Sequence, residues 1–259
     1  MRILITNDDG INAPGLAVLE TIAESLTAPE NIWVVAPAFE QSGVAHCISY
    51  TRPLMMAEMG ARRYAVEGSP ADCVIAGVGE AMPERPDLVL SGVNRGNNSA
   101  ENTLYSGTLG AALEGALQGI PSIGLSQYYG PANARAEDPF EAARVHGADV
   151  IRRIKKAGFD GGAEYGLFYN VNFPPVPADD VAGTQVVRQG VRPGVHFGAE
   201  GSIAPNGRKF LWIKGGNQHV SVAEGTDAAA NLSGYISVTP MRADLTAHDA
   251  LAGVARAFD

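Results

Sequence analysis

Short apolar segments that alternate with helical patterns are the feature of this 259-residue chain that most constrains its fold. Arg2–Thr6 is the first apolar segment, and leucine, isoleucine and alanine residues at helical spacing follow it up to Leu26. Further apolar segments lie at 32–36, 64–66, 87–90, 121–125 and 167–171, with helical patterns at 108–118 and 140–154. Strands that are apolar on both faces and separated by helices are typical of a parallel sheet covered on both sides. We therefore predict an α/β fold.

The chain changes character after about residue 174. Residues 1–174 form the predicted α/β core, whereas Gly and Pro become frequent from there to about residue 225. In that stretch only Val186–Arg188 and Phe210–Lys214 favour strands. We expect residues 175–259 to contain a hairpin or arm, a strand that completes the core, and a terminal helix. The arm would serve as an oligomer contact or as a lid over a pocket.

Composition excludes several classes of protein. Lys and Arg number 19 against 28 Asp and Glu, so the net charge of −9 opposes binding of a nucleic-acid polymer. A local site can still bind one small phosphorylated ligand. The two cysteines show no zinc-site spacing, and no apolar stretch approaches the roughly 20 residues that span a bilayer. With no signal peptide before the first strand, we expect a reduced, cytoplasmic protein without a membrane partner.

Three oxygen-rich loops follow predicted strands. Asp8 and Asp9 lie at the end of the first strand, Ser42 follows the second, and Asn94 follows the strand at 87–90. The carboxyl ends of parallel strands share one edge of a sheet, where ligands bind. These four side chains would form a hard, all-oxygen set suited to Mg²⁺ or Mn²⁺. Alternatively, the aspartates form an Asx turn or a helix cap, and Ser42 and Asn94 only bond within their loops.

A fourth loop, Tyr105-Ser106-Gly107-Thr108, opens the Ala-rich helical pattern. Hydroxyl groups, a small glycine and free backbone N–H groups at a helix N-terminus form a ready site for an anion such as phosphate. An ordinary Ser or Thr helix cap would explain the same residues. A hard cation beside a phosphate site is the arrangement of a phosphomonoesterase.

Several motifs together resemble the SurE family. They are Asn7–Gly10 with Ala-Pro-Gly at 13–15, Ala-Pro at 36–37 with Gln-Ser-Gly at 41–43, and the motifs at 68–74, 91–94, 105–108, 170–172 and 234–240. The resemblance runs from residue 1 to about 240. Members of this family are metal-dependent 5′/3′-nucleotidases and in some cases exopolyphosphatases. The resemblance implies a Rossmann-like core, a divalent metal, and a homodimer or homotetramer assembled through C-terminal segments.

The resemblance also implies roles for individual residues. It makes metal ligands of Asp8, Asp9, Ser42 and Asn94, and it places four residues around the phosphate: Asn98, Ser106, Gly107 and Thr108. The chain departs from the family pattern at Ala38-Phe39, where Asp-Arg is frequent. It also has Arg95 where a small residue is usual and Asn97 where Pro is common. None of these departures changes a metal ligand that the resemblance implies, but they would affect substrate preference.

We predict a metal-dependent phosphomonoesterase acting on nucleoside 5′- and 3′-monophosphates, with short polyphosphate as a further candidate substrate. One divalent cation per subunit, Mg²⁺ or Mn²⁺, would bind a phosphate oxygen and lower the pKa of a bound water. Asp8 or Asp9 would orient or deprotonate that water, and an aspartyl-phosphate intermediate is the competing mechanism. The alternative function is a nucleotide- or phosphate-sensing module without turnover, in which the coordination shell of the metal is closed.

Two side chains keep open roles. Arg95 would pair with the phosphate or remain a solvated loop charge. His46 would protonate the leaving oxygen or act as a structural loop histidine.

Overall fold

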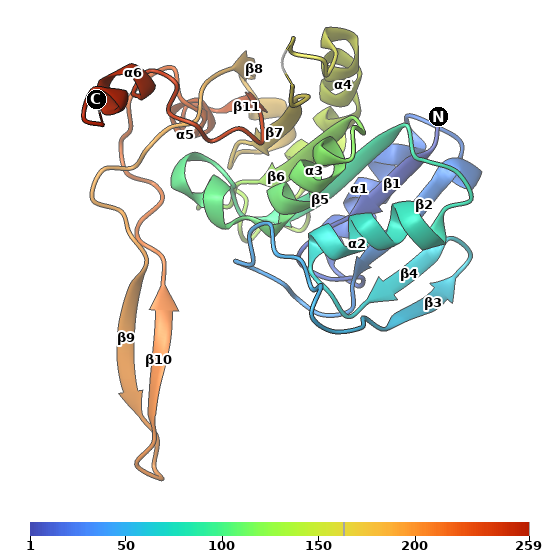
Figure 1. The fold of residues 1–259 in the computed structure, drawn as a ribbon, viewed down its shortest axis with the longest axis horizontal. Helices are drawn as coiled ribbons and strands as arrows, with labels where there is room; N and C mark the ends of the chain where they lie inside the picture. Colours follow the sequence, from blue (N-terminus) through green and yellow to red (C-terminus); the bar gives the residue numbers. More distant parts are fainter. Residues whose placement is uncertain (163, 259) are drawn as a thin grey trace.

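A nine-stranded sheet forms the centre of the molecule (Figure 1). The computed structural model describes residues 1–162 and 164–258. The strands of the sheet are β1 (Ile3–Thr6), β2 (Ile32–Pro37), β3 (Met56–Gly60), β4 (Arg63–Val66), β5 (Leu88–Arg95), β6 (Ser122–Gln127), β7 (Phe168–Phe173), β8 (Gly183–Val186) and β11 (Tyr235–Met241). Their order across the sheet is β3-β4-β2-β1-β5-β6-β7-β11-β8.

The middle of this sheet is parallel, as predicted. Strands β4, β2, β1, β5, β6 and β7 run in one direction, and Ile3 lies opposite both Ile32 and Leu88. Antiparallel pairs occur only towards the sides, between β3 and β4 and between β7 and β11, within the described residues. The sequence did not predict β3, because Met56–Gly60 is largely exposed and lacks an apolar run.

Helices cover both faces of the sheet. Their bounds are α1 (Pro14–Glu24), α2 (Pro70–Ala76), α3 (Gly107–Leu117), α4 (Glu141–Ala157), α5 (Asp227–Leu232) and α6 (Leu251–Ala255). Short 3₁₀ helices lie at Pro29–Asn31, Ala100–Tyr105 and Ala178–Asp180, and a π turn at Gly77–Ala81. Ile3 and Ile5 pack into the core under α1 and α4, whereas Leu4 packs into the one under α2 and α3. Because alternate residues of β1 enter opposite cores, Ile3, Leu4 and Ile5 are all apolar.

A capping box closes the start of α2. Ser69 accepts a hydrogen bond from the Asp72 backbone N–H at 3.0 Å, and Asp72 accepts one from the Ser69 N–H at 2.8 Å. Pro70 occupies the first helical position, where its missing N–H costs nothing. This reciprocal pair satisfies two N–H groups that the helix itself leaves unbonded.

The order of the strands reverses next to β1. The chain passes from β1 to β2 on one side and later returns to β5 on the other side of β1. At such a switch point the loops beyond the carboxyl ends of the two strands separate and leave a crevice. The polar loops singled out by sequence follow β1 and β5.

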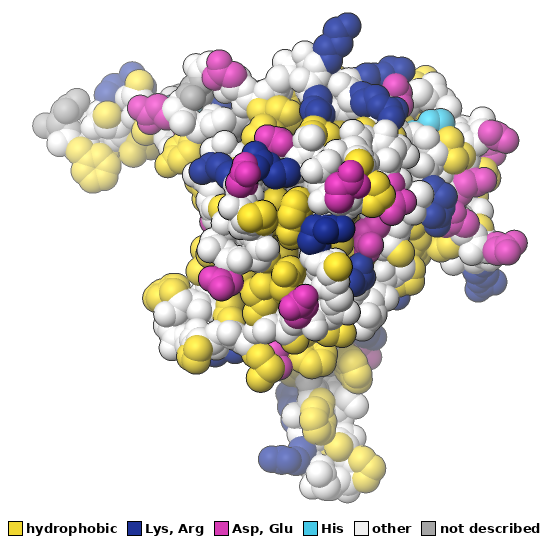
Figure 2. Space-filling view, turned by 90° about the vertical axis from the view of Figure 1, so that its right-hand side faces the viewer, with side chains coloured by type: hydrophobic (Ala, Val, Ile, Leu, Met, Phe, Trp, Pro, Cys, Tyr) yellow, Lys and Arg dark blue, Asp and Glu magenta, His cyan; other side chains and the backbone are white. Residues whose placement is uncertain are grey.

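One part of the C-terminal segment adds strands to the sheet, and another part forms an arm outside it. β11 and β8 extend the sheet beyond β7, while β9 (Gly198–Ile203) and β10 (Lys209–Lys214) pair with each other as an antiparallel arm. The arm stands away from the body and carries apolar side chains on its surface (Figure 2). The strand expected at 186–188 lies instead at Gly183–Val186 and shares only Val186 with the predicted range, whereas β9 and α5 were not predicted.

None of the helices in the described part of the chain combines the length and the apolar character needed to cross a membrane.

Candidate active site

A cavity of about 230 Å³ opens at the carboxyl end of the sheet, between the loops that follow β1 and β5. Five of the eight site residues singled out by sequence line it: Asp8, Ser42, Asn94, Asn98 and Ser106. These residues come from the end of β5 and from four separate loops, so the topology joins motifs that are up to about a hundred positions apart. The remaining three, Asp9, Gly107 and Thr108, adjoin the cavity through the contacts described below.

Asp8 is a buried carboxylate at the floor of the site. Only 4% of its surface is exposed, and its Oδ1 accepts a hydrogen bond from the Thr108 hydroxyl at 2.7 Å. Burial raises the pKa of Asp8 to about 6; the bond from Thr108 opposes this shift and the nearby charge of Asp9 adds to it. A positive partner beside Asp8 would favour its charged form and lower this pKa.

Asp9 points towards the end of β5. Its Oδ2 accepts a hydrogen bond from the Arg95 backbone N–H at 3.1 Å, which ties the loop after β1 to the end of β5. Burial raises the pKa of Asp9, and the hydrogen bond and charge of Arg95 counteract that effect. Asp9 lines a second, larger cavity that lies beside the first.

The donor set fits a hard divalent cation. The Asn94 amide donates to Gly96 O at 3.0 Å, so the side-chain oxygen of Asn94 is its acceptor for a ligand. The Ser42 hydroxyl donates to Glu40 at 2.9 Å and keeps lone pairs on its oxygen. Within the described residues no group of three or more His, Cys, Asp or Glu forms a metal site. A cation here would therefore depend on two carboxylates and neutral oxygens, a set that Mg²⁺ or Mn²⁺ accepts.

The N-terminus of α3 lies directly against Asp8. A Cβ atom added at Gly107 would lie 2.9 Å from the Asp8 Cβ and 3.1 Å from the Pro70 Cγ, so this close approach requires glycine. Ser106 caps the helix by accepting from the Leu109 N–H at 3.1 Å, and its own hydroxyl proton remains available to a ligand. Thr108 is buried and uses its hydroxyl on Asp8. The positive end of α3 thus faces the cavity, where an anion is stabilised.

Asn98 is held by asparagines of β7. Its backbone N–H donates to Asn172 Oδ1 at 2.7 Å, and its carbonyl accepts from Asn170 Nδ2 at 2.8 Å. The Asn98 side chain in turn donates to the Ser126 hydroxyl at 2.8 Å. The motif at 170–172 therefore supports the site by fixing the backbone of the loop after β5.

Comparisons with known proteins agree with this geometry. The family model described as "Survival protein SurE" matches residues 3–194. The chain belongs to the SurE family. A protein from Roseobacter denitrificans named "5'-nucleotidase SurE" is 65% identical over 98% of both chains, and one of the same name from Ruegeria pomeroyi is 65% identical over 97% of both. The crystal structure of the SurE protein from Aquifex aeolicus matches all of both chains with a TM-score of 0.80 and 35% identity.

Sequence reasoning missed the residue that anchors the SurE site from the C-terminal side. Arg192, at the base of the arm, is only 1% exposed. Its guanidinium donates to Asn97 Oδ1 at 2.8 Å, to Ser99 O at 3.1 Å and to Glu101 at 3.0 Å. No local motif marks Arg192, because its partners lie more than 90 residues earlier in the chain.

The structure distinguishes between His46 and Arg95, the two residues for which the sequence left two roles open. His46 Nε2 lies 2.8 Å from Glu114 Oε2 on α3, and His46 is not among the residues that line the 230 Å³ cavity. This contact favours the structural interpretation of His46. Arg95 instead lines both the smaller and the larger cavity of this SurE chain.

Proposed function

We propose that this chain is a metal-dependent phosphomonoesterase that hydrolyses nucleoside 5′-monophosphates, and 3′-monophosphates in addition, to a nucleoside and phosphate. One observation carries the proposal: Gly107 brings the positive end of α3 against Asp8, so the groups proposed for an anion and those proposed for a hard cation lie next to each other at one cavity. Relatives that match nearly the whole chain carry the name 5′-nucleotidase, which supports the same substrate class.

We assign the residues as follows. Asp8, Asp9, Ser42 and Asn94 would hold one Mg²⁺ or Mn²⁺ per subunit. When bound, this cation supplies Lewis acidity to the phosphoryl group. Four residues would bind the phosphoryl oxygens: Asn98, Ser106, Gly107 and Thr108. Of these, Ser106 would donate its hydroxyl, and Gly107 and Thr108 would contribute the N–H groups of the first turn of α3.

The attacking group in this proposal is water. Asp8 or Asp9 would orient the water and accept its proton, while the alcohol of the nucleoside leaves from the opposite side of the phosphorus. The bond from Thr108 to Asp8 and the bond from Arg95 to Asp9 hold both carboxylates in place, which supports a positioning role over a nucleophilic one. An aspartyl-phosphate route would leave a phosphoenzyme that hydroxylamine cleaves, and we expect none in acid-quenched reactions with radiolabelled substrate.

The deciding experiment measures phosphate release from nucleoside 5′- and 3′-monophosphates. The protein is stripped with EDTA and then supplied with Mg²⁺ or Mn²⁺, and Asp8→Asn serves as the matched variant because its amide oxygen still accepts from Thr108. We expect metal-dependent release by the native chain and a loss of at least about a thousandfold in the variant. Nucleotide binding without release under either metal would establish a sensing module instead.

We also propose that the protein is a homodimer or homotetramer. The support is the arm, on which Leu211, Trp212 and Ile213 are 61–68% exposed. Exposed apolar side chains in adjacent positions are typical of a surface that a partner covers.

A further inference from the structure

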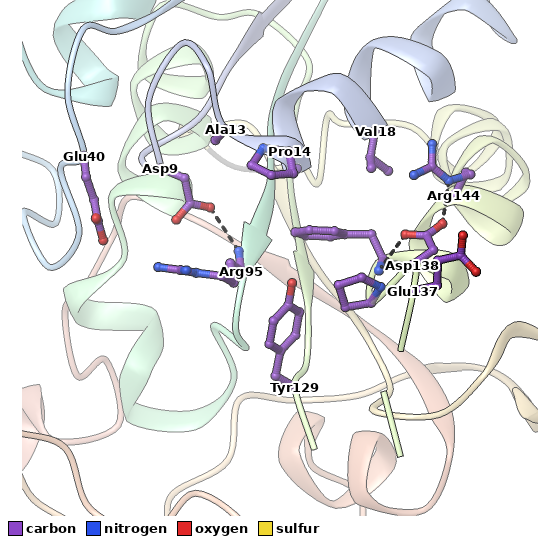
Figure 3. A pocket seen from close by; sticks show the side chains of 13 residues that line it. Asp9, Ala13, Pro14, Val18, Glu40, Arg95, Tyr129, Glu137, Asp138 and Arg144 are labelled. Atoms are coloured by element: carbon purple, nitrogen blue, oxygen red, sulfur yellow. Dashed lines mark hydrogen bonds and ion pairs between the residues drawn. The ribbon is translucent and has the colours of Figure 1, made fainter. Parts of the chain in front are cut away.

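A second cavity of about 740 Å³ adjoins the site and has no role in the chemistry assigned so far (Figure 3). It lies between the start of α1 and the segment 129–140, and it contacts Asp9 at its inner end. Arg95 lines both cavities, so the two form neighbouring compartments on either side of this side chain.

The volumes of the two compartments indicate which part of a substrate each one can hold. Small-molecule sites typically measure about 300–1,000 Å³, and the larger cavity falls within that range. The smaller one, about 230 Å³, has room for a phosphoryl group and a cation and little more. The part of a substrate that extends beyond its phosphate must therefore lie outside the smaller cavity.

The walls of the larger cavity suit a flat, partly apolar group. Tyr129 and Phe140 meet edge to face, with ring centroids 5.8 Å apart. Pro14 and Val18 add apolar surface from the start of α1. Tyr129 extends its hydroxyl into the space beside Arg95 (Figure 3). Aromatic surfaces of this kind stack on nucleobases without regard to sequence.

The charge of the larger cavity argues against further phosphate groups. Glu40, Glu137 and Asp138 line it together with Asp9, against two arginines, Arg95 and Arg144. Arg144 is already paired with Asp138 at 2.8 Å. A chain of phosphates entering this space would meet excess negative charge, whereas ribose hydroxyls and base amino groups would find acceptors.

We propose that the larger cavity holds the nucleoside of the substrate, with the base against Tyr129 and Phe140 and the acidic rim accepting from the sugar or base. This inference rests on the proposed function. It orients the substrate so that the phosphate lies at the α3 N-terminus and the nucleoside extends past Arg95 towards α4. It makes Tyr129 a specificity residue for nucleoside monophosphates, and it makes the acidic rim selective against di- and triphosphates.

A rival location for the base is the opposite rim of the smaller cavity. Tyr105 and Phe197 lie there and pack edge to face at 4.8 Å. Both rings are about half exposed and form no enclosed space of nucleoside size. The larger cavity is therefore the better site, and variants at the two tyrosines distinguish the locations.

The test compares Tyr129→Leu with Tyr105→Leu and with Tyr50→Leu, an exposed tyrosine outside both cavities. For each variant, the KM for AMP and the inhibition constant of inorganic phosphate are measured with Mn²⁺ present. We expect Tyr129→Leu to raise KM about tenfold or more while the inhibition constant of phosphate stays within twofold. Tyr50→Leu should leave both constants within threefold, and Tyr105→Leu should raise the KM for AMP less than Tyr129→Leu does. Unchanged melting temperatures would confirm that each variant folds.

The outcomes separate the inference from the proposed function. A KM for AMP within twofold of the native value in Tyr129→Leu would overturn the inference, as would a large increase confined to Tyr105→Leu. An equal rise in the inhibition constant of phosphate would also contradict it, because the loss would then lie in the phosphate compartment. If the native chain releases no phosphate at all, the proposed function fails. In that case calorimetric titration of AMP into the same variants still tests where the nucleoside binds.

Discussion

The loops at the sheet edge and the base of the arm shape the same cavity by different means. The turn after β1 is closed by its own residues, since Asn7 donates to Gly10 O and accepts from the Gly10 N–H. The base of the arm, residues 189–197 and 215–219, instead depends on long-range contacts such as the one from Arg192 to Asn97. The comparison separates two tasks: a short-range turn closes the loop after β1, and long-range contacts hold its two carboxylates and fix the loop that they face.

Among changes that leave the proposed ligands themselves in place, the largest effect on activity should follow a change at the contact between α3 and Asp8. Gly107→Ala would force a methyl group to within 2.9 Å of the Asp8 Cβ, so either the helix or the carboxylate must shift. We expect kcat/KM for AMP to fall about a hundredfold, because small displacements of reacting groups carry large penalties. Gly60→Ala is the matched control, since a Cβ there meets nothing within 4 Å. Native-like kinetics in Gly107→Ala would show that the contact is not essential.

A smaller effect is expected where one hydrogen bond orients a proposed ligand. Thr108→Val removes the hydroxyl that donates to Asp8 while keeping the shape of the side chain. Loss of such a supporting bond typically weakens metal binding 10- to 100-fold, and we expect about tenfold weaker binding of Mn²⁺ in calorimetric titration. Thr21→Val provides the control on the exposed face of α1. Equal Mn²⁺ affinities in the two variants would place the cation away from Asp8.

The base of the arm should respond mainly through stability. Arg192→Met leaves Glu101, Ser99 and Asn97 without their buried donor, and breaking a buried charged contact costs about 3 kcal/mol of unfolding free energy. We expect a KM for AMP raised several-fold, because the loop containing Asn98 loses its support, and a kcat within about threefold. The exposed Arg188→Met is the control. A lower free energy of unfolding with an unchanged KM for AMP would show that Arg192 has only a structural role.

The same division explains what the sequence could predict. Asp8, Ser42 and Asn94 could be predicted to share one cavity because Asp8 and Ser42 follow apolar strands and Asn94 lies near the end of β5, and the rules of parallel sheets bring such positions to one edge. Arg192 and Gln218 also contact the loop around Asn97, but neither stands in a local pattern, and folding alone brings them there. The strand β3 was missed for a related reason: at the edge of the sheet its side chains are mostly exposed, so no apolar periodicity marks it.

Thr108 shows that a motif can predict a position in the site without predicting which group its side chain binds. Its position in Ser106-Gly107-Thr108 predicts a phosphate contact, and the structure instead joins its hydroxyl to Asp8. Sequence spacing cannot tell these partners apart, because both lie within reach of the first turn of α3. Its backbone N–H remains the group proposed for phosphate.

The smallest effect on turnover should come from strand β10 of the arm, where we expect assembly to change instead. An isolated two-stranded hairpin is marginally stable in water, and the arm exposes Leu211, Trp212 and Ile213 along one strand. Contact with another copy would both cover these side chains and hold the hairpin, so replacing all three with Ser should lower the molar mass measured by light scattering. Arg208→Ser with Lys209→Ser is the control on the same hairpin. None of the five lines either cavity, so activity per subunit should stay within about threefold. An unchanged mass in the triple variant would mean that the arm does not join subunits, and its apolar surface would then need a different partner.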